Sequence, residues 1–274
     1  MNSPSPHSAT SPPAITALVE AMISRLDETG RLVCTPGPLA ETAVHEARKN
    51  LKSIRAGLRM LRDAGGVDLS RANGLCRDVG RLLSGLRDID VCLLSLEGLP
   101  EIPTDSRREL TIRLQARREE LHEARALDEA AQGEIAADLR GIEDELRALD
   151  PGRFSTASLV QAVNRSRKLG EKRCRGLEPA SDAEKFHDVR KAAKRELYQR
   201  RYLAASRQID DPRIDALDGL GEHLGRHQDL CVLRELAAEL GGLTEEVANV
   251  LDAETLRERS ECLDRVRQVY GIRQ

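Results

Sequence analysis

Apolar residues recur every three or four positions along most of the chain, which is the period of an amphipathic α-helix. No stretch shows the period of two that a half-buried strand requires. The pattern predicts helices over residues 14–28, 39–63, 70–96, 105–149, 156–175, 182–207, 212–240 and 244–270. Gly30 is expected to end the first helix, and Gly133 or Gly141 to interrupt the fourth. We therefore predict an all-α fold, with the clearest boundary at Asp150-Pro151-Gly152.

Cations gather on one side of the helix expected over residues 39–63. At about 100° per residue they share roughly one 140° sector beside an apolar sector. The basic sector holds His45, Arg48, Lys49, Lys52, Arg55, Arg59 and Arg62. Glu46, the only acid between residues 44 and 62, is expected to point away from it. Like charges at this spacing repel one another, so the row either borders the core with its aliphatic stems or binds an anion.

The same order of residues returns once. His187, Arg190, Lys191, Lys194 and Arg201 follow His45, Arg48, Lys49, Lys52 and Arg59 at a constant separation of 142 positions. Further on, Gly221-x-x-Leu224 matches Gly80-x-x-Leu83 at a separation of 141. Two matched blocks at nearly one separation indicate an internal duplication. Because a simple border of the core has no need to repeat its order, the duplication favours anion binding.

The segment expected as a helix over residues 156–175 carries a third row of cations. Arg165, Lys168 and Lys172 fall on one face of it, and we expect them to join the same site. In the helix over residues 70–96, Asp88 is expected to hold a basic side chain of the neighbouring helix in place. Gln228 stands where the first half has Arg87.

Composition restricts the function further. The net charge is −3, so attraction to an anion must come from segregated charge. Two Phe, three Tyr and no Trp leave the core to aliphatic side chains. Six scattered cysteines lack metal-site spacing, and most are expected to be buried. Residues 1–13 are expected to be a disordered tail, with no secretion signal and no membrane span, which favours the cytoplasm.

A His-x-x-Arg-Lys-x-x-Lys helix occurring twice in an all-helical chain resembles the CHAD family, the conserved histidine α-helical domain, here as a stand-alone member. The resemblance implies two pseudo-twofold-related four-helix bundle units, over residues 14–150 and 151–274, with a basic central cavity. It also implies that the cavity binds inorganic polyphosphate and targets the protein to polyphosphate-containing granules.

The residues themselves support phosphate as the ligand. Guanidinium groups match phosphate oxygens bidentately, lysines add mobile charge, and a cationic row at helical spacing can meet successive phosphates with release of counterions. The two histidines are expected to have lowered pKa values among so many cations. No segment matches a phosphate-binding loop or a nucleophile elbow, so we expect no catalysis and no cofactor. The oligomeric state stays open.

Three alternatives remain open. Nucleic acid is also a polyphosphate, but single-strand binders use stacking aromatics, which this chain nearly lacks; duplex binding through the backbone remains possible. An exposed helical histidine is also compatible with a phosphotransfer bundle. Finally, His223 and His227, with Glu222, are spaced to share a metal ion, although a third firm ligand is missing.

Overall fold

The computed structural model describes residues 14–34, 39–124 and 129–271, in which it contains helices and no strands. The predicted tail, residues 1–13, lies outside the described residues. The helices are α1 (Ala14–Val33), α2 (Glu41–Gly65), α3 (Ser70–Leu82), α4 (Ser84–Glu97), α5 (Thr104–Ala124), α6 (Glu129–Arg147), α7 (Thr156–Cys174), α8 (Ala183–Arg207), α9 (Arg213–Glu239) and α10 (Glu245–Tyr270). A single 3₁₀ turn, Pro151–Arg153, precedes α7. The all-α prediction is confirmed.

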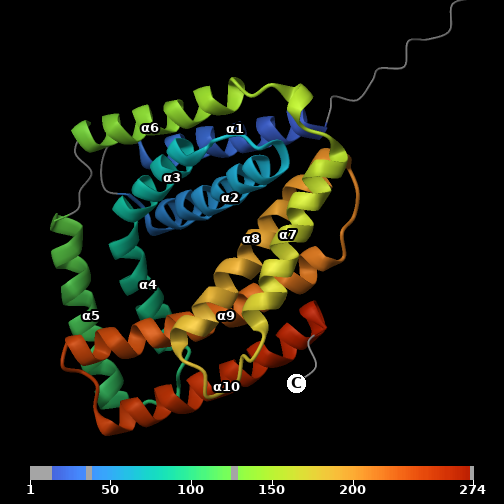
Figure 1. The fold of residues 1–274 in the computed structure, drawn as a ribbon. Helices are drawn as coiled ribbons and strands as arrows, with labels where there is room; N and C mark the ends of the chain where they lie inside the picture. The colour runs from blue at the N-terminus through green and yellow to red at the C-terminus, as the bar shows by residue number, and fades with distance from the viewer. Residues whose placement is uncertain (1–13, 35–38, 125–128, 272–274) are drawn as a thin grey trace, which may run out of the picture.

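Three helix boundaries differ from the sequence prediction. The segment expected as one helix over residues 70–96 is broken at Leu83, and α4 turns away from α3 (Figure 1). Gly85 in the first turn of α4 makes a continuous helix less favourable there. Gly133 and Gly141, either of which was expected to interrupt a helix, both lie inside α6. Helix α1 continues through Gly30, where the side chain of Leu139 lies close to the backbone.

The two basic helices, α2 and α8, occupy the centre of the molecule. Helix α2 packs against α1, α3, α7 and α8, while α8 packs against α1, α2, α7 and α9 (Figure 1). Two buried hydrogen bonds join them: Ser53 Oγ donates to Tyr202 Oη at 3.0 Å, and Gln199 Nε2 donates to the Ala56 carbonyl at 3.0 Å. The apolar sectors of both helices are thus turned inward, and their cations are left at the edges of this contact.

Three apolar clusters hold the helices together. The first is built mainly from α1, α2, α3 and α6. The second joins α8, α9 and α10. The third packs α4 and α5 against α9 and α10, so the hairpin of α4 and α5 lies beside the second half of the chain (Figure 1). The division into units at residue 150 and their twofold relation stay predictions.

The third cluster contains pairs of residues at the separation seen in the sequence. Ile89 and Leu230, Cys92 and Leu233, and Leu96 and Ala237 each lie 141 positions apart and are all buried there. Four of the six cysteines are buried, as expected, and all six are free thiols. None of the helices in the described part of the chain is apolar over a length that would cross a membrane.

Candidate anion-binding site

Two cations of α2 are held against α3. Arg48 Nη1 donates to the Gly80 carbonyl at 2.8 Å, and Arg55 Nε donates to Asn73 Oδ1 at 3.3 Å. Both side chains are half-buried, which limits their freedom compared with a solvated row. His45, Lys49 and Lys52 are exposed.

Arg59 has an unusual environment. Its half-buried guanidinium has no hydrogen-bond or ion-pair partner among the residues that the structure describes. Burial, together with the neighbouring charges of Arg55, Arg195 and Arg62, lowers its pKa to about 10, and Asp63 only partly opposes this shift. The group is still protonated at pH 7, so α2 holds a positive charge that its surroundings do not neutralise.

On α8 the cations lie against the glycines of α9. A Cβ atom added to Gly221 would stand 2.6 Å from both Cε and Nζ of Lys194, so a larger residue there would push the end of this lysine aside. The guanidinium of Arg190 lies beside Gly225, with Nη2 3.6 Å from where a Cβ atom of that residue would stand. Its Nε atom is buried and has no described hydrogen-bond partner. The Gly-x-x-x-Gly spacing of α9 thus lets two basic side chains of α8 lie flat along it.

His187 stands at the start of this row. Burial lowers its pKa, and the charges of Lys191 and Arg190 lower it further. The sequence prediction of a lowered pKa is therefore confirmed for His187. The imidazole is neutral at pH 7, where it can donate or accept a hydrogen bond without adding charge.

Carboxylates accompany both rows. Glu46, expected to point away, instead lies 3.2 Å from Lys49 Nζ and 3.9 Å from His45 Nε2. Residues three apart on a helix are neighbours, and both side chains are long enough to bridge the remaining angle. On α8, Asp188 pairs with Lys191 at 2.8 Å. The rows are thus partly neutralised by the protein itself, which the sequence reasoning had missed.

Arg201 and Lys194 share one of these carboxylates. Asp218 of α9 lies 2.8 Å from Arg201 Nη2 and 3.4 Å from Lys194 Nζ. Burial lowers the pKa of Lys194, and Asp218 opposes that shift.

The C-terminal end of α2 meets α7 and α8. Arg165 donates to the Asp63 carbonyl oxygen, and Arg195 donates to the Asp63 carboxylate at 2.6 Å. Arg59 is close enough to Arg195 for the two charges to interact. Arg165 therefore lies at the end of the α2 row, whereas the side chains of Lys168 and Lys172 are exposed and make no described polar contact.

Arg195 is a basic residue of this region that the sequence prediction omitted. It stands in the matched block at the position of Ser53 in the first half, so the repeat alone gave no reason to select it. Only the packing of α2 on α8 brings it to Asp63 and Arg59.

The role expected for Asp88 belongs to a neighbour. Asp88 is exposed and makes no described ion pair, whereas the buried Asp90 lies 2.7 Å from Arg118 Nε of α5. The bend between α3 and α4 brings this part of the chain mainly against α5 and α9, and to a lesser extent against α2. The side chain of Arg87 lies outside the described residues.

Two of the alternatives can be compared with this geometry. His227 Nε2 accepts a hydrogen bond from Arg259 Nε at 3.1 Å, and His223 Nδ1 lies 3.0 Å from Glu258. Both rings are therefore engaged by neighbouring side chains, and the described residues contain no group of three metal-ligating side chains. All five aromatic residues are buried, so none is available for a base to stack on.

Fold and site together define an all-α protein with two central helices that carry half-buried cations. Residues 17–238 match the sequence model of the CHAD domain, so the chain belongs to the CHAD domain family.

Solved structures share the fold. The crystal structure of the CHAD domain from the plant Ricinus communis is 20% identical, with 99% of this chain and 98% of that chain covered and a TM-score of 0.68. PptA from Streptomyces chartreusis is 17% identical, with 94% and 96% covered and a TM-score of 0.62. A search of curated proteins finds no match.

Proposed function

We propose that this protein binds inorganic polyphosphate along the cationic rows of α2 and α8 and performs no chemistry of its own. The observation that carries the proposal is Arg59, a half-buried guanidinium whose nearest charges are mostly other arginines and which has no described partner. Like charges held together in a partly desolvated place raise the free energy of the unbound protein. A polyanion that neutralises them recovers that free energy on binding.

The geometry of the rows supports a polymeric phosphate. Cations on successive turns of one helix face can each meet a phosphate group of the same chain, and Arg48 and Arg55 are already held in place by α3. Such preorganisation lowers the entropy that binding would otherwise lose. The buried aromatics disfavour single-stranded nucleic acid, which binds largely by stacking on exposed rings.

The test is a competition titration with labelled long-chain polyphosphate at near-physiological salt. The competitors are duplex DNA, single-stranded RNA and orthophosphate. The site variant combines Arg59→Glu with Arg190→Glu, because neither side chain has a described ion-pair partner to disrupt. The control combines Arg257→Glu with Arg267→Glu, which makes the same charge change on the exposed surface of α10.

We expect the site variant to bind about 30- to 150-fold more weakly, because two contacts at about 1–1.5 kcal/mol each are lost. The control should bind like the wild type. The Arg59→Glu change should not lower the free energy of unfolding, because a glutamate at position 59 is attracted by the arginines that repel Arg59. Equal loss in both variants would mean that only net charge matters, and equal competition by DNA would identify a general polyanion binder.

A cellular role at polyphosphate-containing granules in the cytoplasm is part of the same proposal. The six unpaired thiols suit a reducing compartment. A fluorescently tagged chain should collect at granules in cells that make polyphosphate and spread evenly in cells that do not. The site variant should spread evenly in both.

A further inference from the structure

One carboxylate lies between two of the cations to which the anion is proposed to bind. Asp218 Oδ2 lies 2.8 Å from Arg201 Nη2, and Oδ1 lies 3.4 Å from Lys194 Nζ. Lys194 and Arg201 are seven positions apart on α8, two helical turns, so they lie on one face. In the unbound protein Asp218 therefore occupies the place where a phosphate group would contact both.

Gly221 of α9 makes room for the Lys194 side of this contact. Because Gly221 has no side chain, the ammonium group of Lys194 lies directly on the backbone of α9, one turn after Asp218. Lys194 is half-buried, with 26% of its side chain exposed. The side chain of Asp218, in contrast, is 40% exposed and can swing away into water.

The corresponding place in the first half carries the opposite charge. At the separation of 141 that relates Gly221 to Gly80, Asp218 corresponds to Arg77. At the separation of 142, Arg201 corresponds to Arg59. Arg201 is thus paired with a carboxylate, whereas Arg59 has no partner among the described residues.

From this arrangement we infer that Asp218 is a specificity-determining residue that competes with the bound anion for Lys194 and Arg201. The inference rests on the proposed function. A small anion gains little binding free energy when it displaces a carboxylate that is already paired with these cations. A long polyphosphate chain already held by α2 presents further phosphate groups at high effective concentration, and so displaces Asp218. Asp218 would then favour long chains over short phosphates.

The experiment compares Asp218→Asn with Asp252→Asn by titration with long-chain polyphosphate and with pyrophosphate. Asp252 is a matched control, because it is an exposed carboxylate paired with an arginine, Arg234, at 2.8 Å and lies away from the basic rows. Both changes raise the net charge by one. Thermal unfolding of each variant is measured alongside.

We expect Asp218→Asn to bind pyrophosphate about two- to tenfold more tightly, a range consistent with the loss of two part-exposed competing ion pairs. The affinity for long-chain polyphosphate should rise less, so the preference for long chains over pyrophosphate should shrink. Asp252→Asn should leave both affinities and their ratio unchanged.

Two results would overturn the inference: equal behaviour of the two variants, or weaker binding by Asp218→Asn, which would make Asp218 a support for the cations. In both cases the wild type still binds polyphosphate and the Arg59 and Arg190 variant still fails. If the wild type itself does not bind, it is the proposed function that is wrong.

Discussion

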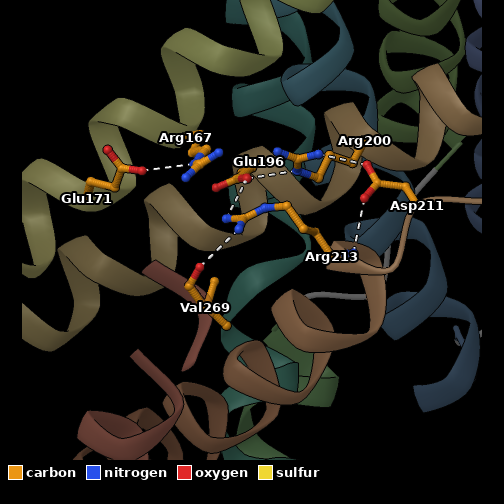
Figure 2. Close-up of polar contacts among 7 residues, drawn as sticks. All are labelled: Arg167, Glu171, Glu196, Arg200, Asp211, Arg213 and Val269. Atoms are coloured by element: carbon orange, nitrogen blue, oxygen red, sulfur yellow. Dashed lines mark hydrogen bonds and ion pairs between the residues drawn. The ribbon is translucent and has the colours of Figure 1, made fainter. Parts of the chain in front are cut away.

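The buried carboxylate of Glu196 offers a sharp test of how α8 tolerates its many cations. Its side chain is 0% exposed, and Oε1 lies 2.7 Å from Arg200 Nε and 3.3 Å from Arg213 Nη2 (Figure 2). Arg200 also pairs with Asp211 at 2.7 Å, and Arg213 donates to the Val269 carbonyl at 3.0 Å. The group joins α8 to the start of α9 and the end of α10.

Replacing Glu196 with glutamine keeps the shape and removes the charge. Breaking a buried ion pair from one side costs about 3–5 kcal/mol. Arg200 still pairs with Asp211, and Arg213 still donates to the Val269 carbonyl. We therefore expect a loss of stability at the lower end of this range, about 3 kcal/mol. At about 2–4 °C per kcal/mol for a chain of this size, the melting temperature should fall by about 6–12 °C.

Glu171→Gln is the matched control. It breaks the pair with Arg167 at 2.9 Å, also drawn in Figure 2, in which the side chains are 45% and 27% exposed. Such a pair contributes about 1 kcal/mol or less. Urea unfolding, with thermal melting as a second measure, compares the two variants. If Glu196→Gln loses no more free energy of unfolding than Glu171→Gln, the remaining partners suffice and the reasoning fails.

Three further predictions concern pH and packing. Polyphosphate binding should tighten as the pH falls below about 6.5, because protonation of His187, whose pKa is lowered, adds charge to the site. The change in affinity with pH should be smaller in His187→Gln. Identical pH profiles of the variant and the wild type would contradict this role of His187. Burial, with the charge of Arg259, lowers the pKa of His227 to about 4, so stability is full above about pH 6.5 and falls toward pH 4 as the unfolded chain takes up the proton. Urea titrations at pH 7 and pH 5 should show that the free energy of unfolding falls less between these two pH values in His227→Gln than in the wild type. Gly57→Val should destabilise the protein by about 1–3 kcal/mol, because an added Cβ would stand 2.6 Å from Met22 Sδ and 3.2 Å from the Tyr202 ring. An unchanged urea midpoint would show that Met22 and the helices can move aside.

The helices and the two cationic rows could be predicted because their signals are local. Apolar period, turn residues and a repeated order of cations depend on neighbours a few positions away. The order His45, Arg48, Lys49 and its return at His187 therefore marked α2 and α8 before any packing was known. The break at Leu83 was missed, because α3 and α4 share one apolar period but pack against different partners.

Which cations are neutralised was decided only by the tertiary structure. The pairs of Asp218 with Arg201 and of Asp63 with Arg195 join residues distant in sequence, so they depend on how the helices pack. The same packing leaves Arg59 half-buried without a described partner. Helical periodicity sets the face on which a charge lies, but the partner of that charge depends on the distance and angle between helices, and one sequence period is compatible with many such arrangements.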